Sequence, residues 1–118
     1  MRRTLVLSEH YSAKKLSMFI YNITSKVEYA IHNEWLQWQK QFHIPAIMQT
    51  GCFTKFQVNR LLETNDEEGF TYTIQYFANT KEDYEKYINE FAPQMRKDVI
   101  EKWGNNFIAF RTLMQVVH

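Results

Sequence analysis

The sequence predicts an α+β domain, in which two helices cover one face of a four-stranded antiparallel sheet. Two observations predict this fold class. Four segments are rich in β-branched and aromatic side chains, which favour strands, and two others space apolar residues by three or four positions, as amphipathic helices do. The segments follow one another in the order β-α-β-β-α-β, which is the ferredoxin-like arrangement. In that arrangement the first and third strands lie in the middle of the sheet.

A strand and a helix make up the first half of the domain. Residues 18–27, MFIYNITSKV, are predicted to form the first strand. In the helix that follows, one apolar stripe comprises Ile31, Trp35, Trp38 and Phe42. Pro45 lacks an N–H and its ring clashes with the carbonyl four residues earlier. We therefore expect the helix to break near His43 and to restart at Pro45, and Gly51 to end the segment.

The second and third strands flank a polar turn. Residues 53–63, FTKFQVNRLLE, are predicted to form the second strand, and the turn TNDEEG ends at Gly69. Residues 70–78, FTYTIQYFA, alternate aromatic or aliphatic side chains with threonine and glutamine. This alternation is typical of a strand whose two faces meet different surroundings.

The second helix opens with a capping box formed by Thr80 and Asp83. Its apolar stripe comprises Tyr84, Tyr87, Ile88 and Phe91 and, after an interruption at Pro93, Met95, Val99 and Trp103. Gly104 ends this helix, and residues 106–117, NFIAFRTLMQVV, are predicted to form the fourth strand.

Composition limits the domain organisation, the compartment and the partners. A chain of 118 residues forms one domain, which we place at residues 18–118. Residues 1–17 lack the pattern that follows and are expected to be an N-terminal extension, disordered or not native. Cys52 is the only cysteine, which fits a reducing cytoplasm. Residues 18–118 hold ten basic and twelve acidic residues, which argues against nucleic-acid binding, and no apolar run approaches the roughly 20 residues that span a bilayer.

Strand alternation predicts which side chains face the helices and which lie on the open face of the sheet. The helix side is expected to hold Phe19, Tyr21, Ile23, Phe56, Val58, Tyr72, Ile74 and Tyr76. The open side is expected to hold Ile20, Asn22, Thr24, Gln57, Asn59, Thr73, Gln75 and Phe77, with Arg111 and Leu113. In the second and fourth strands, the odd-numbered and the even-numbered positions are each about half apolar. The sequence therefore leaves open which of the two sets faces the helices in these strands. A face that mixes amides, an arginine and large apolar groups indicates contact with a partner or a ligand.

Several short clusters resemble a known family. They are YNIT in the first strand, WLQW followed by HIP and GCF, then TYTIQYF, DYEKYINEFAPQMR and FIAFRTLM. Together they resemble the uncharacterised family called domain of unknown function 4286, over about residues 18–117. The resemblance implies the dimeric α/β-barrel superfamily, in which two ferredoxin-like subunits face their sheets together. That superfamily includes cofactor-free monooxygenases, haem-degrading enzymes, polyketide cyclases and proteins of no known chemistry, so the resemblance implies no single activity.

Three residues are candidates for catalysis. At the end of the first helical piece, His43 would either cap free carbonyls or act as a general base in the cleft between helix and sheet. Asn22 and Arg111 lie in mid-strand, where neither residue type is favoured. On the open face they would present an amide and a guanidinium to an anionic or carbonyl-bearing ligand, with Gln75 beside them, or form a polar network between two subunits.

The other ligand-binding candidates are Tyr72, Tyr76 and Trp38, although core packing alone accounts for the tryptophan. No metal is expected, because histidines and carboxylates do not recur at ligand spacing. No cofactor is expected either. Haem degradation in the superfamily uses a histidine of the second helix, and residues 80–104 hold none.

These observations predict a small cytoplasmic homodimer that associates through its open sheet face and has a binding or structural role. A small-molecule ligand would lie between sheet and helices. The alternative is a cofactor-independent enzyme, monooxygenase- or cyclase-like, acting on a small aromatic or carbonyl substrate. In that case Asn22 and Arg111 would stabilise an oxyanion and His43 would move protons. A third possibility is a regulatory ligand sensor.

Overall fold

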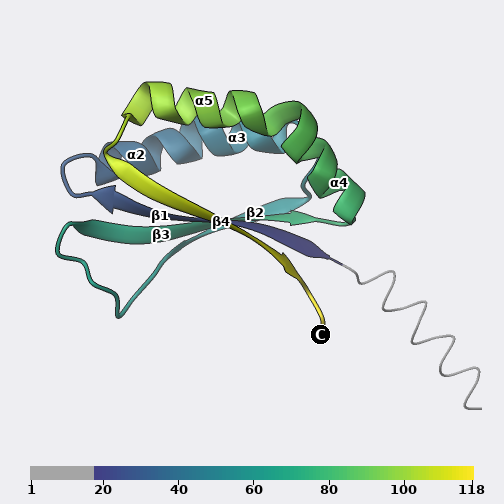
Figure 1. Cartoon of the computed structure of the whole chain (residues 1–118), viewed down its shortest axis with the longest axis horizontal. Helices are drawn as coiled ribbons and strands as arrows, with labels where there is room; N and C mark the ends of the chain where they lie inside the picture. The colour runs from purple at the N-terminus through teal and green to yellow at the C-terminus, as the bar shows by residue number, and fades with distance from the viewer. Residues whose placement is uncertain (1–17) are drawn as a thin grey trace, which may run out of the picture.

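The computed structural model describes residues 18–118, so the expectation for residues 1–17 lies outside the described residues. Strands and helical regions follow one another in the predicted β-α-β-β-α-β order, and the α+β ferredoxin-like fold is confirmed (Figure 1). The elements are β1 (Phe19–Glu28), α2 (His32–Trp38), η1 (Gln39–His43), α3 (Ile44–Met48), β2 (Lys55–Arg60), β3 (Gly69–Ala78), α4 (Lys81–Lys86), η2 (Tyr87–Phe91), α5 (Ala92–Trp103) and β4 (Phe107–Gln115).

The four strands form one antiparallel sheet in the order β2-β3-β1-β4, so the first and third strands are central, as predicted. Both helical regions lie over the same face of this sheet, and no helix of residues 18–118 covers the other face (Figure 1). Tyr21 of β1 lies opposite Tyr76 of β3 on one side and opposite Leu113 of β4 on the other. Residues opposite one another in an antiparallel sheet point to the same face, so this register assigns every strand residue to a face.

The predicted faces are right for β1, β2 and β3 and wrong for β4. Arg111 lies opposite Ile23 and Leu113 lies opposite Tyr21, so both point to the helix side rather than to the open side. The open side instead receives Ile108, Phe110, Thr112 and Met114. The two alternations of β4 are almost equally apolar, so the hydrophobic pattern could not fix its phase, and only pairing with β1 does so.

Neither helix breaks at its proline. Each contains one wide turn, in which an N–H bonds five residues back: Ile44 N–H donates to the Gln39 carbonyl, and Ala92 N–H donates to the Tyr87 carbonyl. Ile44 keeps helical angles, with φ −60° and ψ −47°, so the expected break near His43 is wrong. Pro45 and Pro93 follow these two π turns near the start of the next α-helical segment, where a missing N–H is tolerated.

The first π turn also changes which side chains face the sheet. The buried positions run Trp35, Gln39, His43, Ile47, with Ile44 beside them. Phe42, which the sequence pattern placed on the buried stripe, is 63% exposed. With the α-helical period of 3.6 residues, Phe42 would lie on the inner face of the helix. The extra residue of the π turn instead rotates Phe42 outward and His43 inward.

Aromatic side chains fill the space between sheet and helices. The ring of Tyr21 lies 5.6–6.4 Å, between ring centroids, from those of Phe53, Tyr76, Tyr84 and Tyr87. The cluster joins β1 and β3 to the start of the second helical region. The buried apolar side chains of this core are Tyr21, Val27, Trp35, Ile44, Ile47, Cys52, Phe53, Tyr72, Ile74, Tyr76, Ala78, Tyr87, Ala92 and Trp103.

The predicted helix boundaries hold at three positions. Thr80 Oγ1 accepts a hydrogen bond from Asp83 N–H at 3.1 Å, as half of the expected capping box. Gly51 and Gly104 follow the two helical regions with positive φ angles of 77° and 59°. Strand β2 is shorter than predicted, because pairing with β3 is limited to Lys55–Arg60.

Gly69 provides a test of the β1–β3 pairing. It lies opposite Glu28, and a Cβ at this position would lie 1.9 Å from the Val27 carbonyl oxygen. We expect Gly69→Ala to lower the free energy of unfolding by about 2–3 kcal/mol, since the backbone must move to relieve the clash. Urea denaturation followed by circular dichroism measures this loss.

Gly51→Ala is the matched control. Its Cβ would meet no atom within 4 Å, although its φ of 77° disfavours a side chain. We expect this variant to lose about 1 kcal/mol, from backbone strain alone. If Gly69→Ala loses no more than Gly51→Ala, the close approach of the two strands at this point is contradicted.

Candidate functional site

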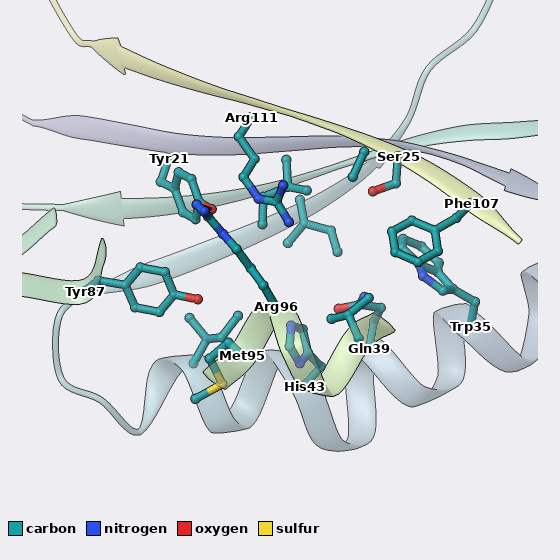
Figure 2. A pocket seen from close by; sticks show the side chains of 15 residues that line it. Tyr21, Ser25, Trp35, Gln39, His43, Tyr87, Met95, Arg96, Phe107 and Arg111 are labelled. Carbon is teal, nitrogen blue, oxygen red and sulfur yellow. Dashed lines mark hydrogen bonds between the residues drawn. The ribbon is translucent and has the colours of Figure 1, made fainter. Parts of the chain in front are cut away.

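A cavity of about 30 Å³ lies between the sheet and the helical layer. Its walls come from β1, β3 and β4 on one side and from both helical regions on the other (Figure 2). The enclosed volume holds about two water molecules. The polar side chains that line it are Tyr21, Ser25, Gln39, His43, Tyr87, Arg96 and Arg111.

The two π turns supply three of these residues. Gln39 and His43 are the first and last residues of η1, and Tyr87 is the first residue of η2. Wide turns of this kind occur frequently at functional sites, because they present side chains that a regular helix would direct elsewhere. Both wide turns of residues 18–118 therefore contribute to this cavity.

His43 is a neutral, buried imidazole at the helical wall. The side chain is 8% exposed, and its ring stacks on Trp38 with ring centroids 4.8 Å apart and planes 17° apart. Burial lowers the pKa of His43 from 6.5 to about 4, although the negative charge of Asp98 opposes this shift. The helix continues past His43 into Ile44, so the alternative in which His43 caps free carbonyls at a helix end does not apply.

Two guanidinium groups point into the cavity from opposite walls. Figure 2 shows Arg96 extending from the helical layer toward the sheet and Arg111 extending from β4 toward the helices. Arg96 donates a hydrogen bond of 3.1 Å to the Tyr21 hydroxyl. Burial and the neighbouring Tyr21 raise the pKa of Tyr87, whereas the positive charges of both arginines act to lower it. Tyr87 and both arginines line the same cavity.

The polar groups of the cavity are incompletely paired. No aspartate or glutamate lines it, and the ion pairs found within residues 18–118 join Arg60 to Asp66 and Lys97 to Glu101. Neither cavity arginine thus has a carboxylate partner in the described chain. Two buried atoms, Nε of Arg96 and Oε1 of Gln39, have no hydrogen-bond partner there. Unpaired buried polar atoms are costly, and a bound molecule is one way to satisfy them.

The structure brings together only two of the three catalytic candidates. His43 and Arg111 both line the cavity. Asn22 lies across the sheet, on the open face beside Gln75, so the expected pairing of Asn22 with Arg111 on one face is wrong. Asn22 Nδ2 donates to Thr24 Oγ1 at 2.9 Å, and its buried Oδ1 has no partner in residues 18–118.

The remaining ligand-binding candidates do not line the cavity. Tyr76 is buried in the aromatic core, where burial raises its pKa. Tyr72 stacks on Trp35, and its hydroxyl lies 3.2 Å from Nδ1 of His32. Trp38 stacks on the ring of His43 and meets Trp103 edge to face.

Gln39 and Arg96 line the cavity but were not among the residues predicted from the sequence. The signal for Gln39 was its place midway between Trp35 and His43, four residues from each, once a buried histidine is accepted on that face. Arg96 follows Met95 on the apolar stripe and lies four residues after the buried Ala92. A long arginine at the border of an apolar stripe is commonly a solvated side chain, so this signal is weak.

Two further features are absent from the described residues. Across residues 18–118, no three histidine, cysteine, aspartate or glutamate side chains lie close enough together to hold one metal ion. The same part of the chain contains no helix with the length and apolar character needed to cross a bilayer.

The buried His43 predicts a specific pH dependence of stability. Between pH 6.5 and about 4 the unfolded chain binds a proton that the folded chain does not, so stability falls as the pH falls through this window. From pH 7.5 to 4.5, wild type should lose on the order of 2 kcal/mol more unfolding free energy than His43→Gln, which cannot titrate. Urea denaturation at both pH values measures the difference.

His118→Gln is the control, because this terminal histidine is exposed. It should keep the full wild-type dependence on pH. A His43→Gln variant whose stability falls with pH as steeply as that of wild type would contradict a buried, neutral His43.

Solved structures of low sequence identity share the fold. A dimeric ferredoxin-like protein from an uncultured marine organism has a TM-score of 0.62 and 13% identity, covering 86% of this chain and 96% of that chain. An ethyl tert-butyl ether D (EthD) family protein from Bacillus halodurans has a TM-score of 0.59 and 14% identity, covering 85% and 98%. A mutant of SnoaB, a cofactor-independent oxygenase from Streptomyces nogalater, has a TM-score of 0.56 and 7% identity, covering 86% and 94%.

Sequence comparison adds the family. No curated protein matches the sequence. The profile of one family, described as domain of unknown function (DUF4286), matches residues 18–117, which is nearly all of the described chain. This match confirms the resemblance found in the sequence clusters. The chain belongs to the DUF4286 family.

Proposed function

We propose that this protein is a cytoplasmic homodimer that binds a small molecule in the cavity between its sheet and its helices. The observation that carries the proposal is the cavity itself, into which buried polar atoms point without a partner in residues 18–118. A purely structural domain would close this space with apolar side chains, because unpaired buried polar groups lower stability. The buried free thiol of Cys52 supports a reducing compartment.

The open face of the sheet supports association with a second copy. Phe110 is 67% exposed on this face, and Ile108 and Met114 of the same strand are exposed beside it. Together with Ile20 and Phe77 they give the face an apolar character that favours burial. The ferredoxin-like protein from an uncultured marine organism, which has a similar fold, is dimeric.

The centre of the open face is polar, and this supports a specific register between two copies. Asn22 and Gln75 lie opposite one another on the central strands. The unpaired Oδ1 of Asn22 requires a donor, which a facing sheet can supply. Polar groups within an apolar interface cost stability unless they are paired, so they select one arrangement of the two subunits.

A cofactor-independent enzyme is the second candidate. It is favoured by the neutral imidazole of His43 in a cavity that also holds two guanidinium groups, since such a set can accept a proton and stabilise an enolate. The fold is also similar to that of a cofactor-independent oxygenase. A pKa of about 4, however, makes His43 a weak base at neutral pH, and a general base works best near the operating pH. Binding therefore ranks above catalysis.

The interface is tested by Phe110→Glu. A carboxylate in the apolar part of the open face should weaken self-association by at least about tenfold, because each copy would bury an unpaired charge in the interface. Sedimentation equilibrium over a range of protein concentrations measures the dissociation constant of the dimer.

Phe42→Glu is the matched control. Phe42 is exposed to a similar degree, at 63%, but lies on the helical layer. It should leave the dimer unchanged. A wild-type monomer, or a Phe110→Glu variant that dimerises as tightly as wild type, would contradict association through the open face.

The binding role is tested by native mass spectrometry of the protein purified from its host, followed by the same measurement under denaturing conditions. We expect dimers that carry a small molecule, which denaturation releases and which the mass identifies. Arg111→Gln should carry less of it, because this side chain lines the cavity. A wild-type protein that retains no compound and binds none in a screen of small metabolites would contradict the binding role.

A further inference from the structure

We infer that the cavity binds the head group of a small hydroxycarboxylate, with the carboxylate between Arg96 and Arg111 and the hydroxyl on Gln39. This inference rests on the proposed binding function and names the chemical class of the ligand. Three properties of the cavity lead to it: its charge, the kind of hydrogen-bonding atom left unpaired, and its size.

The charge of the cavity selects an anion. Arg96 and Arg111 enter from opposite walls, and no carboxylate of the lining residues neutralises them (Figure 2). Neither arginine forms an ion pair within residues 18–118. The buried Nε of Arg96 also has a proton to donate and no acceptor there. A carboxylate accepts two parallel hydrogen bonds from one guanidinium, and such charge-assisted bonds are stronger than neutral ones.

The unpaired acceptor atom of Gln39 indicates that the ligand also carries a hydroxyl group. Oε1 of Gln39 is buried and has no donor within the described chain, although the side chain lines the cavity. A carboxylate has only acceptor atoms and cannot satisfy this oxygen. A hydroxyl group beside the carboxylate donates one hydrogen bond and so pairs with it. One ligand thereby satisfies Nε of Arg96 and Oε1 of Gln39 together.

The closed part of the cavity is smaller than the head group. About 30 Å³ holds the equivalent of two water molecules, whereas a hydroxycarboxylate head group has about five heavy atoms. Binding therefore requires the exposed side chain of Arg111 to move outward, and a ring or a long chain does not fit inside. The cavity is bordered by β4, an edge strand, and Arg111 on this strand is exposed. The body of the ligand therefore extends outward at this edge, where Phe107 and Ala109 of the same strand contribute apolar wall.

A matched set of probes tests the inference by isothermal titration calorimetry at pH 7.5 and constant ionic strength. Mandelate carries both groups, phenylacetate lacks the hydroxyl, and 1-phenyl-1,2-ethanediol lacks the carboxylate; glycolate is the head group alone, and inorganic phosphate is the alternative anion. We expect mandelate to bind. Loss of the hydroxyl should weaken binding by roughly fivefold and loss of the carboxylate by at least roughly tenfold, as the strengths of neutral and charge-assisted hydrogen bonds indicate.

Three variants locate the head group. Arg111→Gln should weaken mandelate by at least about tenfold, and Arg111→Lys should restore part of the affinity, because lysine keeps the charge but not the paired donors. Gln39→Leu should remove the difference between mandelate and phenylacetate. The control is Arg60→Gln, since Arg60 lies outside the cavity and pairs with Asp66. It should leave the affinity for mandelate unchanged.

The outcomes separate this inference from the proposed function. Equal binding of mandelate and the diol, tighter binding of phosphate than of either hydroxycarboxylate, or no binding of mandelate and glycolate would each overturn the inference. If native mass spectrometry then finds a retained neutral or cationic compound, the proposed binding function stands and only the hydroxycarboxylate inference fails. If it finds none, and none of the probes binds, both fail.

Discussion

The arrangement of the helical layer depends on one constraint, the missing N–H of two prolines. Pro45 and Pro93 cannot donate the bond that an α-helix requires, and each follows a π turn in which Ile44 or Ala92 bonds five residues back. The wide turn keeps each helix continuous and adds one residue to it. In the first helix this residue rotates Phe42 outward and His43 inward. A polar cavity then lies where a regular helix would continue an apolar core.

Local patterns in the sequence were sufficient to predict the element order, the sheet order and the aromatic core. They were insufficient wherever the outcome depends on pairing between distant segments or on a departure from the regular period. Phe42 fits the 3.6-residue period, and its exposure follows from a turn that this period does not describe. Arg111 lies in a strand with two apolar faces, so only its register with Ile23 places it in the cavity.

Burying the polar groups of the cavity lowers the stability of the fold, and packing of the surrounding apolar core offsets this loss. Gln39 and His43 are buried there, Nε of Arg96 has no partner within residues 18–118, and burial holds His43 neutral. At the sheet wall of the cavity, the ring of Tyr21 packs against several aromatic rings, and its hydroxyl accepts the hydrogen bond from Arg96. One residue thus belongs to both the apolar core and the polar site, which fixes the position of the guanidinium relative to the sheet.

Strand β4 connects the two parts of the proposed function. Its side chains alternate, so the neighbours Phe110 and Arg111 point to opposite faces of the sheet. As an edge strand it pairs only with β1 in the described chain, which leaves it less restrained than the central strands. A second copy that packs on Phe110 would restrain β4 and hold Arg111 in place. A ligand that orders Arg111 would in turn restrain the surface that carries Phe110. Since coupling between two binding events is reciprocal, dimerisation and ligand binding would each strengthen the other.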